Sequence, residues 1–283
     1  FIATATAALE LGARPVLVDV SDDGLTLDPA DLERRLPAGV KAVIPVHLYG
    51  RSADMDPILE LTNARGLKVV EDCAQSHLAR YKGRSVGTLG DFGAFSFYPS
   101  KNLGALGDAG ALTVGDDALA DLAASLRNCG RKAGAQYDHP RPGHNYRLDE
   151  LQAAFLRVKL KRLAAFTAAR RKVAALYREG LKDLPLTLPA PDRKGDQQVY
   201  HVFCVRSERR DALKAHLGQD RGLLPGASAP DRRAQDARPP RGGLPARGVS
   251  LPRSPGPAHV PRDDRRRDRP RRRRRQVLLQ VIG

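Results

Sequence analysis

Cysteine is scarce in this chain of 283 residues, and the three that occur exclude the sites that cysteines usually build. Cys73, Cys129 and Cys204 are widely spaced and form no CxxC or Cys/His pattern. Neither a zinc site nor a disulfide framework is therefore predicted, and no metal is expected. No segment approaches the roughly 20 consecutive apolar residues of a membrane span. Phe1 is not followed by the basic and apolar regions of a signal peptide. We therefore expect a cytoplasmic protein without a membrane anchor.

Lysine and aromatic residues are missing from the end of the chain. Residues 220–283 contain seventeen Arg, no Lys and six Asp, so this segment carries +11 of the formal net charge of +16. No Phe, Tyr or Trp follows Cys204. We predict a disordered, low-complexity tail over 220–283. An arginine-rich tail that binds nucleic acid is one interpretation. A GC-rich gene read out of frame also yields this composition, and we favour that explanation.

The remainder of the chain alternates strand and helix patterns, which favours right-handed βαβ crossovers and a largely parallel sheet with helices on both faces. Asp28-Pro29 is a strong helix start, since an N-cap is followed by proline at the first helical position. A smaller second domain is expected to open with a strand at 197–205 and a helix at 210–217. In the first part we predict strands at 15–20, 40–46, 67–71, 92–97 and 109–114, and helices at 1–11, 30–36, 54–64, 117–128, 149–163 and 164–181.

One lysine and one aspartate suggest a site for a carbonyl cofactor. Lys101 follows the predicted strand 92–97 and precedes a run with three glycines. Asp72 comes directly after the predicted strand 67–71, at the sheet edge where open α/β folds bind ligands. A lysine that forms a Schiff base and an acid that holds a protonated pyridine nitrogen are the pair that pyridoxal phosphate requires. Taken alone, Asp72 is equally well explained as a helix N-cap and Lys101 as a surface lysine.

Three stretches make the chain resemble a known family. The resemblance covers residues 1 to about 217 and is to the DegT/DnrJ/StrS family of fold-type-I, pyridoxal-phosphate-dependent sugar aminotransferases. It implies pyridoxal 5'-phosphate as cofactor, a keto-sugar substrate (usually nucleotide-linked), and glutamate or glutamine as amino donor. The stretches are PVHLYGRSADMD from Pro45, VVEDCAQSHLARYKGRSVGTLGDFGAFSFYPSKNLGALGDAGAL from Val69 and NYRLDELQAAFLRVKL from Asn145.

The resemblance implies a role for residues in the second stretch. Lys101 matches the lysine that forms the Schiff base with the cofactor and then acts as general base. Asp72 matches the aspartate that keeps the pyridine nitrogen protonated. Gln75 matches a residue near the cofactor's 3-hydroxyl, and Ser96 matches a phosphate ligand.

Two further residues are implied outside that stretch. Phe1 falls where the family has an aromatic ring that stacks on the pyridine ring. Asn145 matches an asparagine that reaches the phosphate of the neighbouring subunit's cofactor. The resemblance therefore implies a homodimer with shared active sites. No membrane partner is expected, and a nucleic-acid partner is not favoured because residues 1–219 show no basic stripe or aromatic platform.

The resemblance also divides the chain. We expect an N-terminally incomplete large domain that binds pyridoxal phosphate at 1–165, a linker helix and the start of a small domain at 166–219, and the arginine-rich tail at 220–283. Family members carry a preceding segment with a Gly-Thr phosphate-binding turn and a complete small domain. Without these parts, we expect impaired activity.

Alternative functions remain open at this stage. A cyclitol-ketone aminotransferase would share the same site residues. A pyridoxal-phosphate-dependent sugar dehydratase of the same family would carry histidine in place of Lys101. A nucleic-acid-binding protein that acts through 220–283 would show steeply salt-dependent binding.

Overall fold

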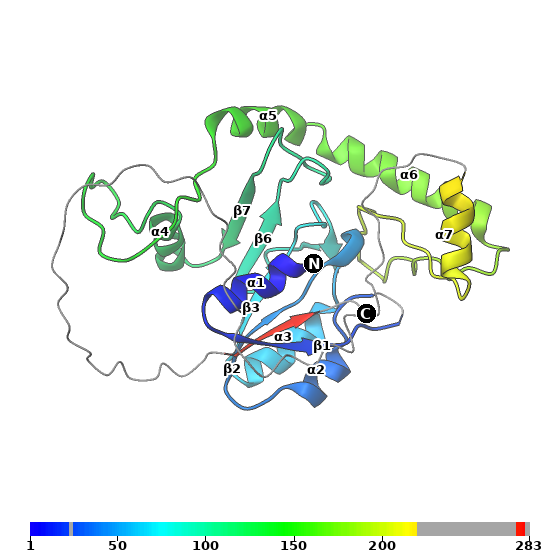
Figure 1. Cartoon of the computed structure of the whole chain (residues 1–283), viewed down its shortest axis with the longest axis horizontal. Coiled ribbons are helices and arrows are strands. Elements are labelled where there is room, and N and C mark those ends of the chain that lie inside the picture. The colour runs from blue at the N-terminus through cyan, green and yellow to red at the C-terminus, as the bar shows by residue number, and fades with distance from the viewer. Residues whose placement is uncertain (23–24, 220–275, 281–283) are drawn as a thin grey trace, which may run out of the picture. The chain divides into compact units, whose positions relative to one another are not determined.

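A computed structural model describes residues 1–22, 25–219 and 276–280 of the chain (Figure 1). None of the helices in these ranges combines the length and apolar character that crossing a membrane requires. The helices are α1 (Ile2–Glu10), α2 (Pro29–Arg35), the 3-10 turn η1 (Leu48–Gly50), α3 (Met55–Ala64), α4 (Asp117–Leu126), α5 (Glu150–Leu160), α6 (Leu163–Leu181) and α7 (Arg210–Gln219). The strands are β1 (Arg14–Val18), β2 (Val40–Ile44), β3 (Lys68–Asp72), β4 (Arg80–Tyr81), β5 (Arg84–Ser85), β6 (Phe92–Ser96), β7 (Gly110–Val114) and β8 (Gln276–Gln280).

The first two helices begin and end as their sequences predict. The Asp28 side chain accepts a hydrogen bond from the backbone N–H of Ala30, and Pro29 opens α2. Gly12 follows α1 with a φ of 68°, the left-handed conformation that commonly ends helices. These local signals fix the end of α1 and the start of α2.

The main sheet has the strand order β1-β8-β2-β3-β6-β7, and every pairing in it is parallel except that of β6 with β7. The predicted α/β class with a mostly parallel sheet is therefore confirmed. Strand β8 comes from 276–280, inside the segment expected to be a disordered tail, and lies between β1 and β2. The prediction for 220–275 and 281–283 falls outside the described residues.

Helices cover both faces of the sheet. In β2, Val43 belongs to the main core together with Leu32 of α2 and Ile58 of α3. The next residue, Ile44, packs with Ala8 of α1 in a separate cluster. Because consecutive strand residues point to opposite faces, α1 lies across the sheet from α2 and α3. Figure 1 shows α1 apart from these two helices.

A loop joins β6 to β7 and carries Lys101. Leu103 and Ala105 of this loop are buried against Leu156 of α5 and Leu163 of α6. The Lys159 ammonium donates to the carbonyl of Gly104. This apolar and polar anchoring fixes the loop to α5, so the lysine-bearing segment has a defined position relative to the sheet.

The strand expected at 197–205 is not formed. Val199 is buried in the main core, and its backbone N–H donates to the carbonyl of Gly50 at 2.9 Å. Gln197 forms an isolated bridge with Arg80. Among the described residues the segment therefore makes isolated backbone bonds to η1 and β4 without continuous strand pairing, so its apolar residues alone did not determine a strand. The division into domains at 165 and 219 stays a prediction.

Candidate active site

Asp72 ends β3 at the carboxyl edge of the parallel sheet, the edge where open α/β sheets place their ligand sites. Its Oδ2 accepts a hydrogen bond from the hydroxyl of Thr4 at 2.8 Å, and its Oδ1 accepts one from the backbone N–H of Ala74 at 3.0 Å. Thr4 lies in the first turn of α1. The carboxylate is thus held between β3 and the start of α1, and each oxygen retains a lone pair for a further donor.

Lys101 lies in the loop after β6, with its backbone N–H bonded to the carbonyl of Tyr98 at 2.9 Å. The side chain is half-buried. Burial lowers the pKa of the Lys101 amine, and the nearby charge of Asp72 opposes that change. Within the described part of the chain the amine forms no hydrogen bond or ion pair, whereas the amines of Lys68 and Lys82 are each paired with an aspartate. The Lys101 amine is therefore available to react and close to a carboxylate.

Gln75 and Ser96 also lie near this edge. The Gln75 Oε1 accepts a hydrogen bond from the backbone N–H of Tyr49 at 2.7 Å, which orients the amide and leaves its NH2 group as a donor. Ser96 is the last residue of β6, two positions beyond Ala94, the residue paired with Asp72. The four predicted residues Asp72, Gln75, Ser96 and Lys101 thus come from strand ends and loops at one edge of the sheet.

Phe1 and Asn145 are not brought into this group. Phe1 is the N-cap of α1 and is 90% exposed, and its carbonyl accepts the N–H of Thr4. Its ring therefore lies at the helix end nearest Asp72 without packing in the core. Asn145 is exposed and forms an isolated bridge with Asn128 after α4. An exposed position is what a contact to a second subunit requires.

His77 packs against two aromatic rings next to the site. The imidazole is buried, and its ring centroid lies 5.7 Å from that of Phe95 and 5.6 Å from that of Phe97. Burial lowers the pKa of His77 to about 4, the nearby backbone of Ser96 acts in the opposite direction, and the charge of Lys101 lowers it further. At neutral pH this histidine is uncharged, which avoids a second cation beside Lys101.

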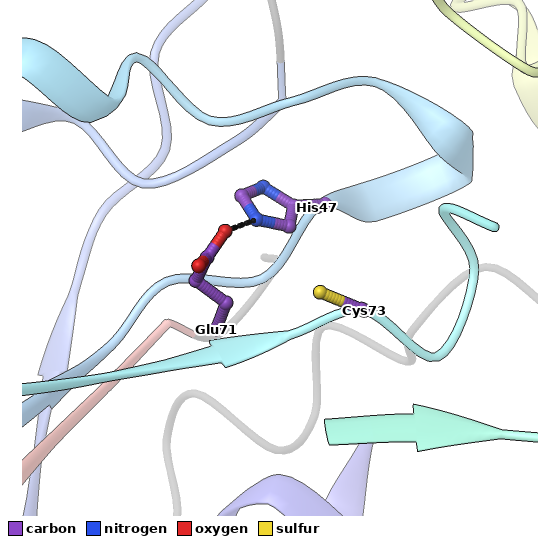
Figure 2. A group of neighbouring side chains, drawn as sticks. All are labelled: His47, Glu71 and Cys73. Atoms are coloured by element: carbon purple, nitrogen blue, oxygen red, sulfur yellow. Dashed lines mark hydrogen bonds and ion pairs between the residues drawn. The ribbon is translucent and has the colours of Figure 1, made fainter. Parts of the chain in front are cut away.

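A buried cluster of His47, Glu71 and Cys73 lies on the other side of β3 (Figure 2). The Nε2–H of His47 donates to Glu71 Oε2 at 2.9 Å, because His47 Nδ1 already accepts the backbone N–H of Ala53. Burial raises the pKa of the Cys73 thiol.

Glu71 itself has no free lone pair for a metal. Its two oxygens also accept the backbone N–H groups of Gly87, Leu89 and Gly90 at 2.7–2.8 Å. A metal would need the thiolate and unoccupied lone pairs on His47 and Glu71. The donor set therefore does not fit a metal ion, and the cluster anchors the loop between Gly87 and Gly90.

Sequence reasoning missed Thr4 and His201. Thr4 contacts Asp72 across 68 positions of sequence, and His201 Nδ1 lies 3.0 Å from the Oδ1 of Asn102, the neighbour of Lys101. Neither residue belongs to a local pattern near the site. The only available signal would have been the fold itself, which brings α1 and the 197–201 segment to this edge.

A lysine and an aspartate at the carboxyl edge of a mostly parallel sheet, with helices on both faces, are the arrangement that the resemblance to fold-type-I aminotransferases implies. The chain belongs to the DegT/DnrJ/EryC1/StrS aminotransferase family, whose profile matches residues 1–222. The resemblance drawn from the sequence is confirmed.

Known relatives extend this result. The chain is 44% identical over 220 residues to dTDP-3-amino-3,4,6-trideoxy-alpha-D-glucose transaminase of Streptomyces venezuelae, covering 77% of this chain and 57% of that protein. The crystal structure of S. venezuelae DesV matches with a TM-score of 0.74 and 45% identity, covering 78% of this chain and 59% of DesV. NtdA of Bacillus subtilis, solved with bound cofactor PMP, matches with a TM-score of 0.71 and 31% identity, covering 78% and 51%. The chain thus spans little more than half the length of these proteins.

Proposed function

We propose that the protein to which this chain belongs is a pyridoxal-phosphate-dependent aminotransferase. It converts a nucleotide-linked keto sugar to an amino sugar, with glutamate or glutamine as the amino donor. The observation that carries the proposal is the half-buried amine of Lys101, which has no hydrogen-bond or ion-pair partner among the described residues and lies near Asp72 at the carboxyl edge of the sheet. The dTDP-sugar transaminase of Streptomyces venezuelae supports the substrate class.

The residues at this edge fit the cofactor. Asp72 has lone pairs to accept a pyridinium N–H, and the Gln75 amide has a free donor for the ring hydroxyl. Ser96 supplies a hydroxyl for the phosphate. Pyridoxal phosphate supplies a carbonyl that binds amines reversibly and a ring that withdraws electrons. Phe1, exposed at the start of α1, is proposed to stack on that ring.

Lys101 holds two proposed roles. In the resting protein its Nζ would hold the cofactor at the carbonyl carbon, with the carbonyl oxygen released as water, and a lowered pKa increases the fraction of unprotonated amine that can do so. When an amino donor has taken its place, the same Nζ is the group positioned to take and return a proton. Asp72 orients the ring and maintains its charge. His77, buried against Phe95 and Phe97, excludes water from one side.

We further propose a homodimer with shared active sites. Asn145 is exposed in the single chain, as a residue that reaches a neighbouring subunit must be. Helix α5, which begins five residues later, presents exposed apolar side chains that a second subunit would cover. These are Leu151, Phe155, Val158 and Leu160. A cytoplasmic location is proposed because Cys73, Cys129 and Cys204 are all free thiols.

Borohydride trapping tests the proposal. The 283-residue chain is mixed with pyridoxal phosphate, the absorbance of the lysine-bound cofactor is recorded, and borohydride then fixes the cofactor to its lysine for peptide mass spectrometry. We expect one pyridoxyl group, on Lys101. Lys101→Ala should lose the band and the label, and the matched surface variant Lys182→Ala should keep both.

The second half of the test uses the amino donor. Glutamate added before borohydride should bleach the band and protect Lys101 from labelling. In a sample without borohydride, a dTDP-linked keto sugar added after glutamate should restore the band. Label spread over surface lysines, with no preference for Lys101, would overturn the proposal.

A further inference from the structure

The residue that follows Lys101 is clamped by two hydrogen bonds to a distant part of the chain. The Asn102 Nδ2 donates to the carbonyl of Val199 at 3.2 Å, so its Oδ1 is left to accept. His201 Nδ1 lies 3.0 Å from that Oδ1 and must therefore carry the proton. The Asn102 side chain is buried, and solvent does not offer it substitutes for these two partners.

The segment that carries His201 is itself held on two sides. Its backbone N–H donates to the carbonyl of Tyr49 at 2.9 Å, and the N–H of Tyr49 donates in turn to Gln75. From α6, the Arg170 guanidinium donates to the carbonyl of Tyr200 at 3.2 Å. A continuous series of hydrogen bonds therefore joins Gln75, close behind Asp72, to the loop that carries Lys101.

His201 is uncharged at neutral pH. Burial lowers the pKa of His201 to about 4, and the charges of Lys101 and Arg170 lower it further. The neutral ring keeps its proton on Nδ1, because that atom faces an acceptor, and leaves Nε2 unprotonated. The ring lines a groove of about 490 Å³ together with Asn102, Arg170 and Tyr200. A protonated His201 would add a second cation near Lys101.

We propose that His201 is a positioning residue for Lys101: its Nδ1–H fixes Asn102 and thereby the turn that holds the lysine amine near Asp72. The inference rests on the proposed function only in taking Lys101 as the reacting amine. Its test needs no cofactor, so it can fail or succeed independently of that function.

Two near-isosteric variants separate the two ring nitrogens. In His201→Asn the side-chain NH2 takes the place of Nδ1–H, whereas in His201→Gln the amide takes the place of Nε2. The first readout is amide hydrogen exchange of the loop 99–105, followed by mass spectrometry. We expect exchange about 2- to 10-fold faster in His201→Gln, the range for loss of one hydrogen bond. His201→Asn and the exposed control His216→Gln should match the wild type.

The second readout is the reactivity of Lys101. The pH midpoint of its reductive methylation by formaldehyde and cyanoborohydride should rise in His201→Gln, because a looser turn exposes the amine to water. It should stay at the wild-type value in His201→Asn. The same two readouts in an Asn102→Ala background should show no further effect of His201→Gln, since the partner is already absent.

Three outcomes would overturn the proposal. One is wild-type exchange and reactivity in His201→Gln. Another is an effect confined to His201→Asn, which would assign the role to Nε2. The third is a full effect of His201→Gln that persists without Asn102, which would show that the imidazole does not act through that residue. Normal Lys101 chemistry with no pyridoxal phosphate band would count against the proposed function and leave this inference standing.

Discussion

Glu71 and Asp72 are consecutive on β3 and direct their carboxylates to opposite faces of the sheet. Glu71 is fully buried and accepts hydrogen bonds from His47 and from three backbone N–H groups of the loop before β6. Asp72 is half-buried, and among the described residues its carboxylate accepts hydrogen bonds only from Thr4 and Ala74. The first carboxylate therefore stabilises the scaffold, and the second remains able to bind a ligand.

Glu71→Gln should destabilise the fold. Burial acts to raise the pKa of Glu71, but its hydrogen bonds from His47, Gly90 and Gly87 outweigh burial and lower it, so the group is ionised at pH 7. A glutamine NH2 cannot accept the bonds made by one carboxylate oxygen. We expect the free energy of unfolding to fall by about 2–4 kcal/mol.

Urea unfolding measures this change, with the exposed Glu33→Gln as a matched control that should lie within about 0.5 kcal/mol of the wild type. Equal stabilities of the two variants would contradict the anchoring role of Glu71.

Asp72→Asn should separate cofactor binding from reaction. The amide keeps the size of the side chain and leaves Lys101 able to bind pyridoxal phosphate, but removes the charge that holds the ring nitrogen protonated. We expect the absorbance band to persist while the rate of bleaching by glutamate falls about 100- to 1000-fold. Thr4→Val removes one hydrogen bond to the carboxylate and should slow bleaching by about tenfold at most. Stopped-flow absorbance measures both rates, and a wild-type rate in Asp72→Asn would refute its role.

Local sequence signals predicted most elements because their causes are local. Asp28-Pro29 starts α2 and Gly12 ends α1 through contacts made within a few residues. The strand predicted at 197–205 did not form because a strand also needs a neighbouring strand along its length, and here single backbone bonds to Gly50 and Tyr49 take that place. Strand β8 was not predicted for the same reason, since its two partner strands are more than 200 residues distant in sequence.

The residues of the candidate site were likewise predictable from the sequence only in part. Asp72 and Lys101 were predictable because each follows a strand that the sequence marks, and parallel strands end at one edge. Thr4, which bonds Asp72, and His201, which bonds Asn102, were not predictable, because both approach from segments that only the fold brings near. The family resemblance supplied the roles of Gln75 and Asn145, which composition and spacing alone could not give.

Buried His77 should make stability depend on pH. Its pKa is lowered to about 4 in the folded chain against 6.5 for the ordinary group. The folded state therefore disfavours the proton, so the stability associated with the neutral ring is fully present above pH 6.5 and is lost as the pH falls through about 4. The complete effect corresponds to about 3 kcal/mol.

Between pH 7.5 and 5.5 we expect the wild type to lose about 1 kcal/mol more unfolding free energy than His77→Leu. Urea titrations at the two pH values measure this difference, and other titrating groups cancel in the comparison. Identical pH dependence in both proteins would show that His77 keeps its ordinary pKa.

Gly104→Ala should displace the Lys101 loop. A Cβ at this position would lie 2.3 Å from the carbonyl oxygen of Pro99 and 2.8 Å from its carbon, which are backbone atoms that cannot move without shifting the turn. The loop is also bound at Gly104 by Lys159, so it cannot relax freely toward α5. We expect the strain to lower the unfolding free energy by about 1–3 kcal/mol.

The same substitution should weaken the binding of pyridoxal phosphate at least tenfold, measured by absorbance titration, because the Lys101 amine moves relative to Asp72. Gly180→Ala is the matched control. Gly180 is exposed near the end of α6, and a Cβ there meets nothing within 4 Å. Alanine at that helical position should raise stability by about 0.5 kcal/mol and leave cofactor binding unchanged. If Gly104→Ala binds the cofactor as tightly as Gly180→Ala, the position of the Lys101 turn does not control its reactivity.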